Sequence, residues 1–224
     1  MSEQFGSEGQ VILPVYLVVD TSASLAGEID SINEAVAAFF RSLLLNPSMA
    51  DIVRVGLIAF SGDARIIKPL SLVGDGRSAP RLVTGGTTNY SAAFTLVREV
   101  IPSDVASLKV RGLRVFRPVM LFLTDGAPAD PLWQTALDEL RKPEFRERPT
   151  IVAIGFGSAD PAIIREIGSG NGGAFMISDA ISVGEAIASI GSALPSMVQA
   201  TLLSSRSPSH ASSGSIPAHW MELG

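Results

Sequence analysis

The sequence predicts an α/β protein with an open, mostly parallel, doubly wound sheet and one antiparallel edge strand. Apolar stretches of strand length alternate with segments that carry apolar residues at helical spacing, the pattern of a parallel sheet covered by helices on both faces. Apolar residues make up 46% of the 224 residues, which is enough for a sizeable buried core. The sequence has no apolar run long enough to cross a bilayer, so we expect no membrane partner.

The first third of the chain predicts a strand, a helix and a hairpin. Residues 11–20 are almost continuously apolar, as in a strand buried on both faces. Residues 25–45 place apolar side chains on one helical face, and an Asn-Pro-Ser stretch ends that helix. Residues 51–62 form a second strand, and residues 64–73 its hairpin partner, whose proline favours a sheet edge.

The middle of the chain combines a glycine-rich loop with two further helices. Residues 74–90 are rich in glycine and lead into a helix at 91–101. Residues 114–126 predict a third buried strand, followed by a helix at 131–142 for which Asp130 is the expected cap.

The last part of the pattern repeats strand and helix twice. Residues 149–157 predict a fourth strand, and a helix at 160–170 opens with Asp then Pro, a favourable cap and first-turn pair. Residues 172–178 predict a short strand, and residues 181–198 a final helix.

These elements predict one domain between two tails. Residues 1–10 are polar, residues 11–198 form the domain, and residues 199–224 are rich in serine and proline, as in a flexible tail. Trp220 is an aromatic residue in that polar stretch that could dock elsewhere, although a disordered end is the favoured interpretation.

Composition excludes several classes of function. The formal net charge of -5, without a basic stripe, argues against a nucleic-acid partner. The absence of cysteine excludes disulfides, zinc-thiolate sites and thiol nucleophiles, and suits a reducing compartment. The first ten residues lack the apolar core of a secretory signal, so we expect a cytoplasmic protein.

Three oxygen-bearing side chains follow the first predicted strand. Asp20, Ser22 and Ser24 alternate, so on an extended segment they point the same way. Ligands of open α/β sheets lie beyond the carboxyl ends of strands, which is where these residues fall. The alternative is a turn that caps the next helix, with Ser24 as its N-cap.

Two later segments bring similar groups to the same edge. Thr87 and Thr88 lie in the glycine-rich loop, and Asp125 ends the third buried strand. Alone, the threonines could cap a helix and Asp125 could belong to an Asp-Gly turn. Together with the first segment they offer two carboxylates and several hydroxyls, which suit a hard divalent cation, Mg²⁺ first and Mn²⁺ or Ca²⁺ as alternatives.

The chain resembles the von Willebrand factor A (VWA) domain and its metal-ion-dependent adhesion site (MIDAS). "VYLVVDTSASLAGEIDSINEAV", "GGTTNYSAAF" and "MLFLTDGAPAD" resemble the three motifs of that site. With "VRVGLIAFSGDARIIKPLSLV" and "IVAIGFGSADPAIIREI", the chain is most similar to the bacterial TerY-like branch, associated with tellurium resistance and stress-response operons. The resemblance covers roughly residues 11–195 and implies a Rossmann-like VWA fold.

The resemblance assigns the hydroxyls of Ser22 and Ser24 as ligands, the two aspartates as ligands directly or through water, and one threonine of the glycine-rich loop as a further ligand. "GGT" indicates Thr87, whereas the spacing to the following "AAF" fits Thr88, which we favour. In related adhesion domains, ligation is coupled to a shift of the last helix, here residues 181–198. The metal site implied by the resemblance consists of Asp20, Ser22, Ser24, Thr88 and Asp125.

We therefore expect a binding module rather than an enzyme. The cation would accept an Asp or Glu carboxylate from a protein partner, in a bacterial stress or tellurium-resistance system. The alternatives are a metal-assisted phosphate-ester hydrolase and a metal-free scaffold. Against a hydrolase, the sequence lacks an Asp-x-Asp pair at Asp20, a P-loop lysine, a Gly-x-Ser-x-Gly elbow, and any histidine outside the tail.

Overall fold

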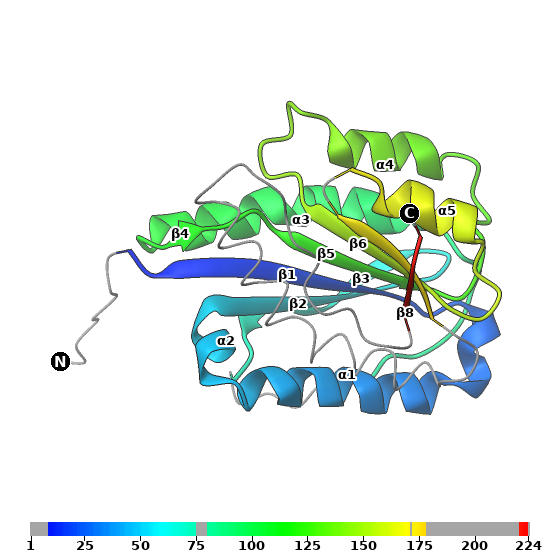
Figure 1. The fold of residues 1–224 in the computed structure, drawn as a ribbon, viewed down its shortest axis with the longest axis horizontal. Coiled ribbons are helices and arrows are strands. Elements are labelled where there is room, and N and C mark those ends of the chain that lie inside the picture. The colour runs from blue at the N-terminus through cyan, green and yellow to red at the C-terminus, as the bar shows by residue number, and fades with distance from the viewer. Residues whose placement is uncertain (1–8, 75–79, 171, 178–219, 224) are drawn as a thin grey trace.

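The chain forms an eight-stranded sheet in a computed structural model that describes residues 9–74, 80–170, 172–177 and 220–223 (Figure 1). Its strand order is β3-β2-β1-β5-β6-β7-β8, with β4 also paired to β1. The strands are β1 (Val11–Asp20), β2 (Val53–Phe60), β3 (Ala64–Leu72), β4 (Arg114–Val115), β5 (Val119–Thr124), β6 (Thr150–Gly155), β7 (Gly173–Ile177) and β8 (Trp220–Glu222).

Strands β2, β1, β5, β6 and β7 run parallel, and an antiparallel strand closes each edge of the sheet. The edge strand β3 was expected, and its Pro69 lies on the outer strand, where a missing amide donor costs least. The second edge strand, β8, was not expected. Residues Trp220–Glu222 were predicted to belong to a flexible tail, but they pair with Phe175–Ile177 of β7. The predicted helix at 181–198 lies outside the described residues.

Helices cover both faces of the sheet, as the sequence predicts (Figure 1). One face packs against α1, and the other against α3, α4 and α5. The helices are η1 (Ala23–Gly27), α1 (Ile29–Leu44), α2 (Pro47–Ile52), α3 (Tyr90–Val110), α4 (Trp133–Arg141) and α5 (Pro161–Gly168). Among the described residues, no helix is long and apolar enough to span a membrane.

Two elements differ in length from the prediction, one because of tertiary packing and the other because of a proline. Helix α3 has 21 residues and continues through Pro102, where the sequence suggested its end. It continues because Ile101, Val105 and Leu108 keep its apolar face buried against the sheet. The strand predicted at 114–126 is divided into β4 and β5 around Pro118, which lacks the amide hydrogen that would continue the ladder.

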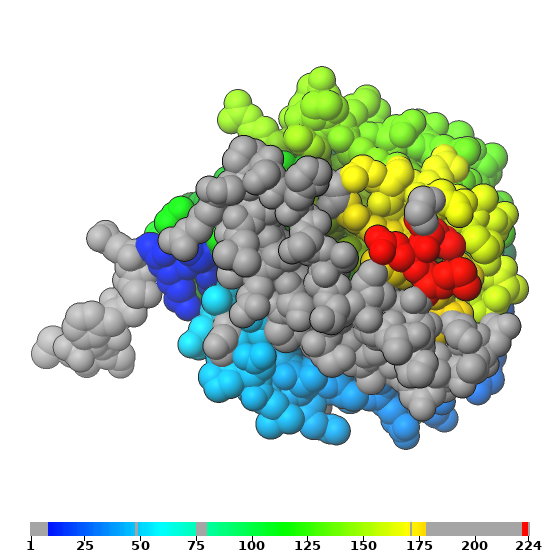
Figure 2. Space-filling view, viewed as in Figure 1, coloured from blue at the N-terminus to red at the C-terminus, as the bar shows by residue number. Residues whose placement is uncertain are grey.

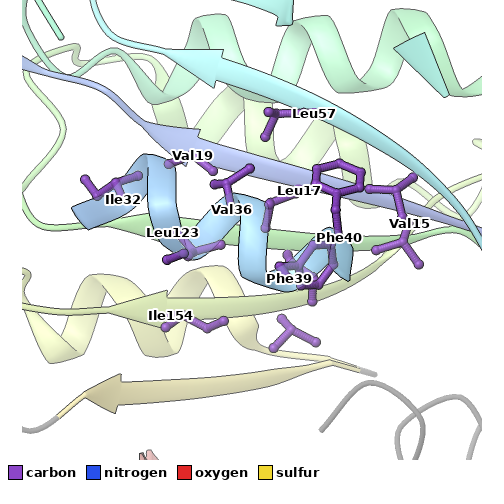
Figure 3. Packing of buried hydrophobic residues seen from close by; sticks show 14 of the residues in the cluster. Val15, Leu17, Val19, Ile32, Val36, Phe39, Phe40, Leu57, Leu123 and Ile154 are labelled. Atoms are coloured by element: carbon purple, nitrogen blue, oxygen red, sulfur yellow. The ribbon is translucent and has the colours of Figure 1, made fainter. Parts of the chain in front are cut away.

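The two faces of β1 pack against different helices. Val15, Leu17 and Val19 point toward α1, where they meet α1 side chains such as Val36 and Phe39 (Figure 3). Since side chains alternate along a strand, the even-numbered residues of β1 point to the opposite face, which α3 covers. The face on which Asp20 lies is therefore set by the register of the whole strand.

A partly buried hydrogen bond connects β1 to α3 on that second face. Tyr16 is 1% exposed as a residue, and its hydroxyl donates to Asp104 Oδ2 at 2.8 Å. Burial raises the pKa of Asp104, and the hydrogen bond from Tyr16 lowers it in part. The pair holds the middle of α3 against the central strand.

The glycine-rich loop before α3 packs closely against the β2–β3 turn. Gly86 has a φ of +78°, which favours glycine, and a Cβ there would lie 3.0 Å from the Gly62 backbone nitrogen. Ser61 Oγ would be 3.3 Å from the same Cβ. Gly86 therefore meets two requirements, a left-handed backbone and a close approach to a neighbouring loop.

We predict that Gly86→Ala destabilises the protein more than Gly112→Ala does. Gly112 has nearly the same φ, +77°, but a Cβ there would meet nothing within 4 Å. The control should lose about 1–2 kcal/mol from the left-handed backbone alone, and Gly86→Ala at least about 1 kcal/mol more from the close contact. Urea-unfolding midpoints of the two variants measure the difference, and equal losses would contradict close packing at Gly86.

Candidate metal site

The predicted site residues gather at the carboxyl ends of three neighbouring strands. Strand β1 lies between β2 and β5, and all three run in the same direction. The loops that follow these strands therefore leave the sheet side by side. They lie at the right-hand end of the sheet in Figure 1, where the chain passes from β1 to α1. Asp20 closes β1, and Asp125 follows directly after β5.

Asp20 is fully buried, and both of its carboxylate oxygens accept hydrogen bonds. The Ser22 backbone amide donates to Oδ1 at 2.8 Å, and the Thr124 hydroxyl donates to Oδ2 at 2.6 Å. Burial raises the pKa of Asp20, the hydrogen bonds from Thr124 and Ser22 oppose this rise, and the nearby charge of Asp125 adds to it. Ionised Asp20 is therefore an anion whose charge is only partly compensated.

Thr124 is a site residue that the sequence analysis missed. Its hydroxyl reaches Asp20 because the register pairs Val19 of β1 with Leu123 of β5, so the next residues of both strands lie side by side on one face. Thr124 is completely buried. A signal was present in the sequence, since a polar residue at the end of an apolar strand, directly before Asp125, needs a hydrogen-bond partner.

The two serines lie at the start of η1 with their hydroxyls in contact. Ser22 Oγ and Ser24 Oγ are 3.0 Å apart; Ser22 is buried and Ser24 is exposed. Ser22 occupies the N-cap position of η1 but makes no capping side-chain bond, and α1 begins later, with Glu28 as its N-cap. Helix capping by Ser24 is therefore not seen, and the two hydroxyls instead lie within hydrogen-bonding distance of each other.

Asp125 has a buried carboxylate oxygen that no described residue satisfies. The residue is 8% exposed, and within the described part of the chain its buried Oδ1 has no hydrogen-bond partner. The Ser158 hydroxyl donates to the backbone oxygen of Asp125 at 2.7 Å, which fixes the main chain but does not satisfy Oδ1. A buried carboxylate oxygen without a donor is costly, so this atom is suited to a cation.

Backbone hydrogen bonds fasten the glycine-rich loop to the loop after β1. The Gly85 amide donates to the Thr21 carbonyl at 2.9 Å, and the Ala23 amide donates to the Gly86 carbonyl at 3.1 Å. The segment that carries the threonines is thus held beside the Asp20–Ser24 segment by main-chain contacts, which do not depend on side-chain flexibility.

The hydroxyl of Thr88, rather than that of Thr87, lies beside the residue that follows Asp125. A Cβ built on Gly126 would lie 3.8 Å from Thr88 Oγ1, so the Thr88 hydroxyl lies next to the residue that follows Asp125. A Cβ built on Gly62 would instead lie 3.6 Å from Thr87 Oγ1, which places that hydroxyl at the β2–β3 turn.

Neither threonine caps α3, because other residues do. The Asn89 side chain accepts from the Ala92 amide at 3.0 Å. Asp130, expected to cap the helix that follows it, instead accepts from the Tyr90 amide at 2.9 Å and the Ser91 amide at 3.3 Å. The loop after Asp125 is thereby fixed to the start of α3, close to Thr88.

The donor set is one of oxygen atoms with two carboxylates. No group of three or more His, Cys, Asp or Glu side chains occurs in the described residues. Any metal held here would thus be bound by Asp20 and Asp125 together with hydroxyls and water, a set that suits hard divalent cations.

A family model and solved structures match the chain. The model of the von Willebrand factor type A domain matches residues 15–189, whereas no curated protein matches. A von Willebrand factor type A structure from Catenulispora acidiphila has a TM-score of 0.64 at 17% identity, covering 82% of this chain and 42% of that one. Proximal thread matrix protein 1 of the mussel byssus has a TM-score of 0.58 at 17% identity, covering 84% and 48%.

A second structure of the mussel protein, with a zinc-occupied MIDAS motif, has a TM-score of 0.58 at 17% identity and covers 85% of this chain and 49% of that one. The chain spans less than half the length of each of these structures, and identities this low show likeness of fold alone. The family model covers most of the chain and agrees with the observed fold. The chain therefore belongs to the von Willebrand factor type A domain family.

Proposed function

We propose that the chain is a metal-dependent protein-binding module whose divalent cation accepts a carboxylate from a partner. The observation that carries this proposal is the buried Oδ1 of Asp125, which has no hydrogen-bond partner among the described residues and lies near the second buried carboxylate, Asp20. The paired serine hydroxyls and the placement of Thr88 beside Gly126 add neutral oxygen ligands. The proposed ligands, direct or through water, are Asp20, Ser22, Ser24, Thr88 and Asp125.

The charges explain why such a site would recruit an external anion. Two buried carboxylates repel one another in the metal-free protein, and a divalent cation removes that repulsion. Two carboxylates only neutralise the ion, so one more anionic oxygen can replace water in its coordination shell. Mg²⁺ is the proposed ion, with Mn²⁺ or Ca²⁺ as alternatives. The zinc-occupied MIDAS motif of the mussel protein shows that a VWA relative holds a divalent metal.

The proposed partner is a protein that presents an Asp or Glu side chain. The exposed Ser24 and the exposed loop residues around Gly86 border the site, so a partner side chain could approach it. A role in a bacterial stress or tellurium-resistance system is proposed from the TerY-like sequence features. We propose binding rather than catalysis because the described residues bring no histidine and no third carboxylate to the site.

We predict that Mg²⁺ or Mn²⁺ raises the melting temperature of the metal-stripped protein, whereas Asp20→Asn removes this response. A site filled at about 100 times its Kd adds roughly 2.7 kcal/mol, or on the order of 5–10 °C for a domain of this size. Differential scanning calorimetry of both proteins, with and without metal, measures the shift.

Without metal, we expect Asp20→Asn not to lower the stability of the protein. Because burial raises the pKa of Asp20, the stability linked to that group is present at low pH and is lost as pH rises through its folded-state pKa. At neutral pH, metal-free Asp20→Asn should therefore be at least as stable as the parent. A less stable metal-free variant, or one that still responds to metal, would contradict the proposed role of Asp20.

The carboxylate-binding part of the proposal predicts a partner that is released when metal is removed. Immobilised wild-type chain should retain a protein in Mg²⁺ and release it in a chelator, because the bond runs through the cation. Asp125→Ala should not retain it. Equal retention by the variant, or retention in chelator, would show binding that does not use the metal site. Identified partners can then be tested by replacing single Asp or Glu residues with Asn or Gln.

A further inference from the structure

We propose that Tyr90 sets the metal affinity of this site, because one buried hydroxyl holds both of its carboxylate segments. The proposal rests on the proposed function and adds a positioning residue that does not itself contact the metal. The Tyr90 hydroxyl lies 2.6 Å from the Gly126 carbonyl oxygen and 3.1 Å from Thr124 Oγ1, and it donates its single hydrogen to this pair of acceptors.

The branch through Thr124 reaches Asp20. Thr124 uses its own hydroxyl hydrogen to donate to Asp20 Oδ2 at 2.6 Å, so its oxygen is left to accept from Tyr90 and, at 3.3 Å, from the Gly126 amide. Tyr90 therefore favours the orientation in which Thr124 donates to the carboxylate. Hydrogen bonds in such a chain polarise and strengthen one another.

The branch through Gly126 reaches Asp125. The Gly126 carbonyl belongs to the residue directly after Asp125, and the Thr88 hydroxyl lies beside the same glycine. A hydrogen bond to this carbonyl restricts the backbone from which the Asp125 side chain extends, and Oδ1 of that side chain has no partner among the described residues. Tyr90 also follows Thr88 by two residues in the chain, so its fixed position limits where the Thr88 segment can lie.

The position of the hydroxyl is fixed by the rest of the Tyr90 side chain and backbone. The residue is fully buried, and Asp130 accepts a hydrogen bond from its backbone amide. Its ring packs edge-to-face in a cluster of aromatic side chains, at centroid distances of 5.0–6.1 Å from Phe60, Phe94, Phe122 and Trp133. Because ligand geometry is set by such supporting groups, loss of the hydroxyl should weaken metal binding even if the ring stays in place.

The test is Tyr90→Phe, with Tyr16→Phe as a matched control. Both changes remove one hydroxyl from a buried tyrosine on the same face of the sheet, and both hydroxyls support a carboxylate. Tyr16, however, bonds Asp104, which is not a proposed ligand. Isothermal titration of the metal-stripped, full-length chain with Mn²⁺ should show roughly tenfold weaker binding for Tyr90→Phe and unchanged affinity for Tyr16→Phe, although both variants lose thermal stability.

Three results separate this inference from the proposed function. Wild-type affinity in Tyr90→Phe, alongside lost binding in Asp125→Ala, would overturn the role of Tyr90 and leave the metal site intact. Equal weakening in Tyr16→Phe would also overturn it, because the effect would then be general loss of stability. Absence of metal binding by the wild type would overturn the proposed function and the inference with it.

A second pair of variants covers the case in which Tyr90→Phe does not fold. Thr124→Ser keeps the hydroxyl that donates to Asp20, whereas Thr124→Val removes it with little change of volume. The serine variant should bind Mn²⁺ like the parent, and the valine variant should bind it roughly tenfold more weakly. Equal affinities in the two variants would overturn the role of the Tyr90–Thr124 connection.

Discussion

The parallel pairing of β1 with β5 is the constraint on which the site depends. Its register sets Val19 opposite Leu123, and the next residues on each strand are Asp20 and Thr124, whose side chains bond at 2.6 Å. A shift of one residue would turn Asp20 to the α1 face and separate it from Thr124. The register is itself held by apolar side chains on both faces of β1, so the hydrophobic core positions a polar site at the sheet's end.

The same arrangement places two carboxylates close together in a buried site, where a bound cation can relieve their repulsion. Asp20 is fully buried and near Asp125, and Asp125 Oδ1 lacks a donor among the described residues. Buried charge without compensation opposes folding, and a cation bound only by the folded chain reverses the sign of that contribution. Asp104 contrasts with Asp125, because the half-buried carboxylate of Asp104 accepts a hydrogen bond from the Tyr16 hydroxyl and belongs to the packing of α3.

The sequence was sufficient for the fold class and for which segments meet at the site. Almost continuously apolar strands that alternate with amphipathic helices indicate a parallel sheet. Parallel strands bring Asp20 and Asp125 to the same end of that sheet. The sequence was insufficient for features that depend on contacts between residues far apart in the chain. The length of α3 beyond Pro102 depends on burial against the sheet, and the pairing of Trp220–Glu222 with β7 depends on an edge that no local pattern reveals.

The supporting residues of the site were the hardest to predict, for a physical reason. Thr124 and Asp130 are defined by partners 104 and 40 residues away in the chain, on strands or helices whose register must be known first. The choice between Thr87 and Thr88 likewise requires the path of one loop past two glycines, Gly62 and Gly126. Motif spacing favoured Thr88, and the loop geometry supplies an independent argument for it.

The central claim is that Asp20, at the end of β1, and Asp125, directly after β5, hold one divalent cation. Its most direct test is a crystal structure of the full chain soaked in Mn²⁺, with an anomalous difference map recorded at the manganese edge. The account predicts a single strong peak at Asp125 Oδ1 and the hydroxyls of Ser22 and Ser24, at about 2.0–2.3 Å from its direct oxygen ligands. A crystal that shows Mn²⁺ at other sites, and no peak beside Asp125, would contradict it.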